Sequence, residues 1–85
     1  MAVPDSPVTL TPEQIEGLNT LLADTRHNVN NNLSLIIAAV ELIKRKPDSL
    51  ERMVGTIAKQ PDKIMTEMRG FSEEFERLLQ ITKEY

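Results

Sequence analysis

The fold depends on the stretch Lys44-Arg45-Lys46-Pro47-Asp48, which separates two long segments with helical apolar spacing. Its three cations suit the C-terminus of a helix, because they oppose the negative end of the helix dipole. Pro47 does not continue a preceding helix, and Asp48, with Glu51 three residues later, is typical of the cap of a second helix. A short turn of this kind predicts two antiparallel neighbouring helices.

The first helix is predicted over residues 11–46. Thr11 suits the N-cap, Pro12 the first helical position, and Gln14 the third residue of a capping box. Residues 1–10 show no periodicity, so we expect a flexible arm there. Apolar residues then recur at steps of three and four, with Thr25 in the one gap: Ile15, Leu18, Leu22, Val29, Leu33, Ile36, Val40 and Ile43, beside a second stripe of Leu21, Leu35 and Leu42.

The second helix is predicted over residues 48–84, after a turn near residue 47. Pro61 interrupts its apolar stripe, and because proline lacks a backbone donor we expect a kink there. The phase of the stripe continues across the proline, which favours one kinked helix over two. The stripe consists of Leu50, Met53, Ile57, Ile64, Met68, Phe71, Phe75 and Leu78.

The apolar stripes are too wide for one neighbouring helix to cover. A lone two-helix hairpin leaves part of each stripe in water, whereas two hairpins bury both in a four-helix bundle. The sequence therefore predicts an all-α fold, an antiparallel hairpin over residues 11–85 that forms a homodimer.

The composition of the chain narrows the classes of partner, cofactor and cellular location that we expect. The 85 residues carry 10 Lys+Arg and 13 Asp+Glu, a net charge of −3, with no cysteine and one histidine. The charges are interspersed, so we expect no nucleic-acid partner. The longest apolar runs are too short for a membrane span, and no signal peptide is recognisable, so we expect a cytoplasmic protein. Without cysteine and with one histidine, neither a metal nor another cofactor is expected.

The most informative stretch is Arg26-His27-Asn28-Val29-Asn30-Asn31-Asn32-Leu33. Its four asparagines lower the stability of a helix by roughly 2 kcal/mol relative to four alanines. A helix with a purely structural role would gain nothing from this loss. Val29 belongs to the buried stripe, so His27 faces outward, and Asn31, one turn later, shares its face. An exposed imidazole among small polar neighbours suits a nucleophile that receives a group from another protein. The plainer interpretation is an ordinary surface histidine.

The pattern His-x-x-Asn-Asn-x-Leu resembles the H-box of sensor histidine kinases, in their dimerisation and histidine-phosphotransfer domain. The resemblance, which covers about residues 11–83, makes His27 the phosphoacceptor and Val29 the apolar position. It gives Asn31 the place of the Asn or Thr that acts in dephosphorylating response regulators, and Leu33 that of the closing leucine. It implies docking of a regulator near His27 and near Glu67, which lies as far after Pro47 as His27 lies before it.

The chain also departs from that family. Asn28 follows the histidine where the family has an acid that serves as general base, and an amide does not accept a proton in that way. No ATP-binding domain is recognisable in the 85 residues, because Gly17, Gly55 and Gly70 are isolated. We therefore do not expect an ATP-dependent kinase from this chain by itself.

The resemblance then implies a stand-alone phosphotransfer domain of a two-component phosphorelay. A phosphoryl group would pass between His27 and an aspartate of a response-regulator receiver domain, or come from a histidine kinase catalytic domain in trans. Whether the chain is an enzyme stays open, since it is also compatible with a fragment of a kinase. Two alternatives remain: a non-catalytic dimeric module that docks or inhibits a regulator or kinase, and a purely structural helical dimer.

Overall fold

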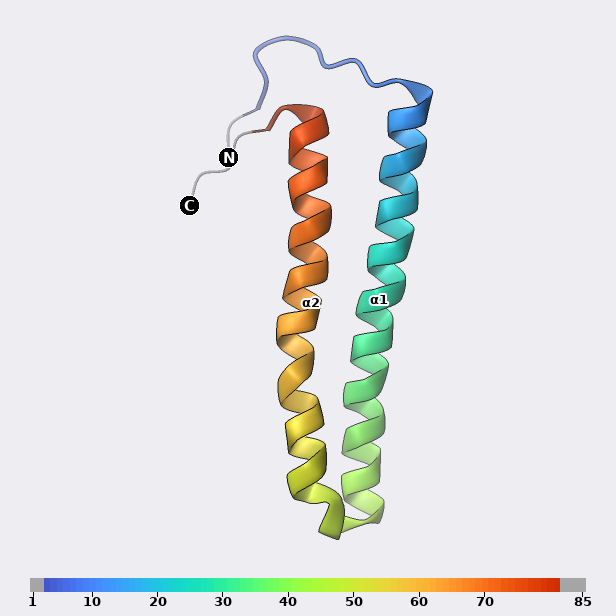
Figure 1. Ribbon diagram of the computed structural model, residues 1–85, viewed down its shortest axis with the longest axis vertical. Helices are drawn as coiled ribbons and strands as arrows, with labels where there is room; N and C mark the ends of the chain where they lie inside the picture. The colour runs from blue at the N-terminus through green and yellow to red at the C-terminus, as the bar shows by residue number, and fades with distance from the viewer. Residues whose placement is uncertain (1–2, 82–85) are drawn as a thin grey trace.

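The computed structural model describes residues 3–81, in which all regular structure is helical. Helix α1 spans Pro12–Arg45, the short 3-10 helix η1 spans Pro47–Ser49, and helix α2 spans Leu50–Leu79. The two long helices run antiparallel, side by side, and η1 joins them at one end (Figure 1). The predicted all-α hairpin is therefore confirmed. Neither long helix is apolar enough along its length to cross a membrane, as judged over the described residues.

The start of α1 is fixed by a capping box. The Thr11 hydroxyl accepts a hydrogen bond from the Gln14 N–H at 3.1 Å, and the Gln14 side-chain oxygen accepts one from the Thr11 N–H at 2.9 Å. These two bonds satisfy backbone donors that the first turn leaves free. At the other end the Lys46 N–H donates to the Leu42 carbonyl at 2.7 Å, and α1 ends there.

The connection differs from the expected one. Residues 47–49 form a 3-10 turn in which the Ser49 N–H donates to the Lys46 carbonyl at 2.9 Å. The Ser49 hydroxyl donates to the same carbonyl at 2.7 Å, and the N-terminus of α2 has no side-chain cap. The predicted cap by Asp48 is therefore wrong, because Asp48 lies within the tighter turn and α2 begins only at Leu50.

Helix α2 continues through Pro61 without a break. Its last residue is Leu79, and Gln80 follows in the left-handed conformation, with φ 56°. The end expected at residue 84 lies outside the described residues. Directly before the proline, the Gln60 amide donates to the Thr56 carbonyl at 2.9 Å.

The hairpin buries very little. Over the described residues the buried side chains are Ala39 and Gln60, each 3% exposed, and Thr25 at 9%. On α1, Thr25, the half-buried Asn32 and Ala39 follow one another at steps of seven residues. On α2, Gln60, Glu67 and Glu74 do the same. These two lines lie on the seam between the helices. Half-buried apolar residues share their angular position, Leu18, Ile36 and Ile43 on α1 and Met53, Ile64 and Phe71 on α2, so the seam mixes polar and apolar side chains.

Large apolar side chains lie in the open instead. We call eight of them the apolar face; each is between 38% and 56% exposed: Ile15, Leu22, Leu33, Val40, Leu50, Val54, Met65 and Met68. At about 100° per residue they lie roughly 60° to 140° beyond the seam positions Thr25 and Gln60, in the same sense along both helices. Antiparallel helices are related by a two-fold axis perpendicular to their common plane, so the same sense of rotation leads to the same side. The apolar face is therefore one continuous side of the hairpin.

Candidate functional site

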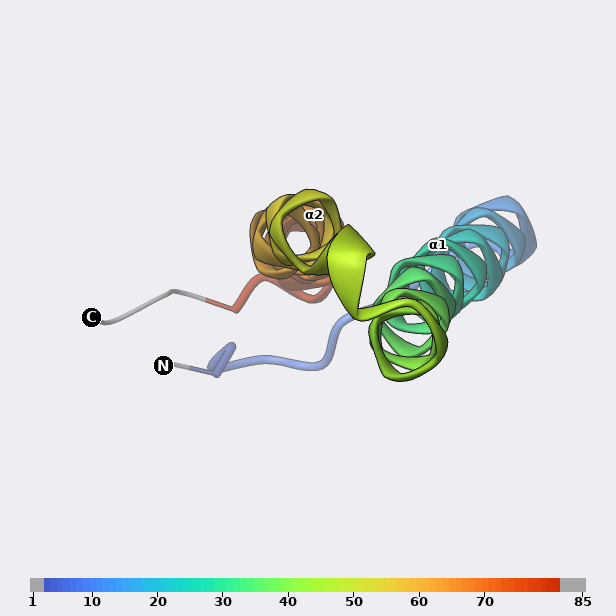
Figure 2. The ribbon, with the colours of Figure 1, turned by 90° about the horizontal axis from the view of Figure 1, so that it is seen from below.

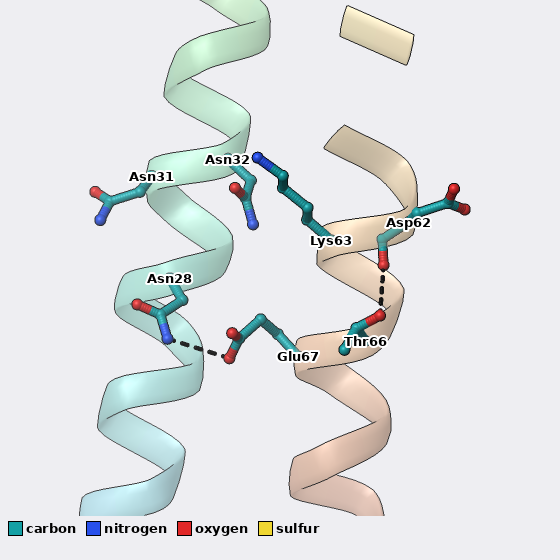
Figure 3. Close-up of a pocket in the computed structure, with 7 residues that line it drawn as sticks. All are labelled: Asn28, Asn31, Asn32, Asp62, Lys63, Thr66 and Glu67. Carbon is teal, nitrogen blue, oxygen red and sulfur yellow. Dashed lines mark hydrogen bonds between the residues drawn. The ribbon is translucent and has the colours of Figure 1, made fainter. Parts of the chain in front are cut away.

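The middle of the hairpin is held by one hydrogen bond between the helices. The Asn28 amide on α1 donates to Glu67 Oε2 on α2 at 3.2 Å (Figure 3). The bond brings Glu67 opposite the Asn-rich stretch, where equal counting from the turn predicts it to lie. Asn28 is exposed and Glu67 is half-buried, so the bond closes the edge of the seam.

His27 and Asn31 lie together on α1. Both side chains are exposed, and the Asn31 amide nitrogen is 3.4 Å from His27 Nε2. The contact follows from their spacing of four residues, which places two side chains one above the other on a helix. The structure thus has His27 facing outward and sharing one helix face with Asn31, as predicted.

A polar groove of about 500 Å³ lies between the helices, lined by Asn28, Asn31, Asn32, Asp62, Lys63, Thr66 and Glu67. Figure 3 shows the side chains of Asn28 and Asn32 directed toward α2, and that of Lys63 directed toward α1. Asn31 points away from α2, toward the face that carries His27. The groove and the imidazole are therefore neighbours that share Asn31, rather than a single pocket.

The groove lies on the side of the hairpin opposite the apolar face. Asn28 and Lys63 are displaced from the seam in the reverse rotational sense to Leu33 and Met68. Because the two helices are antiparallel, this reverse sense also leads to one common side. Asn28, Asn31 and Asn32 thus lie on the side of the hairpin opposite the apolar face, and the exposed Leu35 shares that side with them.

Three residues of the groove were not predicted from the sequence: Asp62, Lys63 and Thr66. The signal was available, because Lys63 precedes Glu67 by one helical turn and Glu67 was expected near the site. Lys63 forms no ion pair with any described residue, although Glu67 is within that turn. The groove therefore offers amides, a hydroxyl, two carboxylates and one unpaired ammonium.

The site presents one imidazole, that of His27, beside side-chain amides. His27 offers a ring nitrogen to an approaching molecule without covering side chains. Among the described residues, no group of three or more histidine, aspartate and glutamate side chains is placed to hold a metal ion. Away from this site, near the end of α2, Arg77 lowers the pKa of Glu74, mainly through a side-chain hydrogen bond.

Comparison with known proteins identifies no relative of this chain: no protein-family model matches its sequence, and neither the curated proteins nor the solved structures yield a match.

Proposed function

We propose that this protein is a histidine-phosphotransfer domain of the two-component type, which exchanges a phosphoryl group between His27 and a receiver-domain aspartate. The observation that supports it most is the setting of His27. Its imidazole is exposed at the middle of a long rigid helix, its Nε2 is 3.4 Å from the Asn31 amide, and a polar groove adjoins it. A partner has room to approach there, because the neighbouring side chains are small amides.

The transfer needs no general base on Asn28. In an aspartyl phosphate the leaving group is a carboxylate, so a neutral imidazole nitrogen attacks phosphorus without first losing a proton. The N–P bond forms, the P–O bond to the aspartate breaks, and its electron pair stays on the carboxylate oxygen. This supports exchange with a receiver domain over phosphorylation by ATP, which in the resembling family uses the acid that Asn28 replaces.

The proposal includes a homodimer in which two apolar faces meet to form a four-helix bundle. One hydrophobic residue, Ala39, is buried among the described residues, so a single hairpin has no core that could offset the loss of chain entropy. The eight side chains of the apolar face expose several hundred Å², more than a soluble monomer usually leaves in one patch. A second copy supplies a face of the same length and pattern. His27 and the groove stay outside that contact, since they lie on other sides of the hairpin.

One observation favours a second function, a docking module without chemistry. Asn28 stands in the position of the usual acid, and its amide is engaged by Glu67 across the seam. A bundle of this kind would bind a regulator or a kinase at the groove and hold it without transferring a group. His27 would then be dispensable for binding.

Phosphoryl uptake tests the proposal. The protein is incubated with phosphorylated receiver domains and, separately, with phosphoramidate, and the label is followed by mass spectrometry under conditions that preserve the N–P bond. His27→Gln is the test variant and Asn30→Ala the matched control, because Asn30 is an exposed amide on the same helix. We expect label in the wild type and the control and none in His27→Gln.

Two results would overturn the phosphotransfer proposal. Receiver binding without label, unchanged in His27→Gln, would make the docking module the better account. Neither label nor binding across the receiver panel would leave a structural dimer.

A further inference from the structure

The side of the hairpin that carries the polar groove also has an apolar edge on α1, which the proposed function does not use. Leu35 and Leu42 are seven residues apart, and Leu35 is 48% exposed. At about 100° per residue both lie roughly 80° to 100° from the seam position Thr25, in the rotational sense of Asn28. A second copy that covers the apolar face does not reach these two leucines, which we call the leucine edge.

On α2 the same side carries a row of cations. Arg52, Lys59 and Lys63 are exposed and follow one another at steps of seven and four residues. They lie roughly 60° to 100° from the seam position Gln60, in the sense that leads to the side of the leucine edge, so this basic edge runs beside it. None of the three forms an ion pair with any described residue. Their charges are therefore available to a partner.

A hollow lies at each end of the strip between the two edges. The hollow near η1, of about 590 Å³, is lined by three cations and one carboxylate, among other residues: Arg45, Lys46, Arg52 and Asp48. The other is the polar groove, where Figure 3 shows Lys63 directed toward α1 and the Asp62 carboxylate directed away from it. Lys63 follows Arg52 by eleven residues, which at 1.5 Å per residue makes the strip about 16 Å long. This length corresponds to three turns of a third helix.

We propose that this strip docks an acidic amphipathic helix of a partner protein. The carboxylates of that helix face the basic edge, and its apolar side chains face the leucine edge. A helix is about 10 Å across, close to the distance between the axes of two packed helices, so it seats between α1 and α2. The unpaired cations select an acidic helix over a neutral or basic one, since charge complementarity sets which partner binds.

Other anionic partners fit the strip less well. A nucleic-acid backbone would pair with the cations and leave the leucine edge in water. An anionic lipid surface is flat, so it would also meet the exposed Asp24, which lies on the same side of α1 beyond the groove. A helix of three turns covers only the strip. It also leaves His27 uncovered, because that residue lies beyond the Lys63 end, so the proposal does not depend on phosphotransfer.

Binding of designed helical peptides to the full chain tests the proposal. Two peptides carry three glutamates at the spacing of the basic edge, one peptide for each direction, with leucines beside them, and fluorescence anisotropy gives Kd. We expect one of them to bind, and we expect Lys59→Glu to weaken its binding about tenfold and Leu35→Ala about fivefold. Arg69→Glu should leave Kd unchanged, because Arg69 is an exposed cation on another side of α2. Replacement of the middle glutamate by lysine should restore binding to Lys59→Glu.

Failure of both peptides to bind would overturn the proposal, as would equal binding of versions with lysine in place of all three glutamates. Binding to phosphatidylserine vesicles that is lost in Lys59→Glu, without binding to either peptide, would assign the strip to a membrane surface instead. The peptides should bind His27→Gln as they bind the wild type. A protein that takes up no phosphate but binds the acidic peptide would therefore refute the proposed function and support this one.

Discussion

Asn28 on α1 and Glu67 on α2 are joined by a hydrogen bond of 3.2 Å, in the same helical turns that hold His27 and the polar groove. The bond is formed by side chains 39 residues apart in the sequence, one on each long helix. The bond places Glu67 opposite the Asn-rich stretch.

The strength of this bond is measurable against a matched neighbour. Asn28→Ala removes the bond but raises helix propensity by roughly 0.6 kcal/mol, whereas Asn30→Ala raises propensity alone. We expect Asn28→Ala to be about 1 kcal/mol less stable than Asn30→Ala in urea unfolding at one fixed protein concentration. A double-mutant cycle with Glu67→Ala should return a similar coupling energy. Equal stability of the two alanine variants would mean that the bond contributes nothing in water.

The apolar face predicts that stability depends on protein concentration. We expect the 9.6 kDa chain to sediment as a dimer and its Tm to rise with concentration, because association stabilises the folded state by mass action. Leu33→Glu and Met68→Glu should abolish the dimer and most of the helical circular dichroism. Thr20→Glu, an equal change of charge at an exposed position displaced toward the groove side, should preserve both. A folded monomer with a concentration-independent Tm would refute the four-helix bundle.

Pro61 should be a site of easy stabilisation. Inside a helix proline costs about 3 kcal/mol relative to alanine, since it leaves the carbonyl four residues earlier without its donor. Part of this is offset because proline also restricts the unfolded chain. We expect Pro61→Ala to raise the free energy of unfolding by about 2 kcal/mol, with exposed Lys59→Ala as the control for propensity. A loss of stability in Pro61→Ala would instead show that the proline shapes a contact of the assembled protein.

The Glu74–Arg77 pair gives a small acid dependence. Arg77 lowers the pKa of Glu74, first through its side-chain hydrogen bond and then through its charge. A lowered pKa in the folded state contributes stability that is complete above the ordinary glutamate value, about 4.3, and is lost as pH falls through the lowered value. We expect Glu74→Gln and Arg77→Ala to flatten the decline of Tm below pH 4 equally. Because the pair is exposed, the effect should also fade in high salt. A wild-type slope in Arg77→Ala would assign the acid dependence to other carboxylates.

Much of the site was predictable because helices carry simple spacing rules. The contact of His27 with Asn31 follows from their four-residue spacing, and their place on the helix face opposite the half-buried Val29 follows from 3.6 residues per turn. The place of Glu67 was predicted by counting the same number of residues after Pro47 as separate His27 from it. This works because two antiparallel helices joined by a short turn rise by the same distance per residue. Lys63 and Thr66 were missed because a charged residue on a long helix has many solvent-facing alternatives. The neighbouring helix decides which of these faces a groove.

The sequence by itself determined that the chain forms two long helices, where the first begins, and that the Asn-rich stretch faces away from the apolar stripe. These features follow from the capping residues at Thr11, from the proline-containing turn that separates the two helices, and from the periodic spacing of apolar residues. The tertiary structure decided which apolar residues lie at the seam and which remain exposed. Thr25, Ala39 and Gln60 occupy the buried positions, while Leu33 and Met68 lie in the open. Periodicity marks only which side of a helix is apolar. The direction in which the two helices face each other depends on packing between residues that are far apart in the chain.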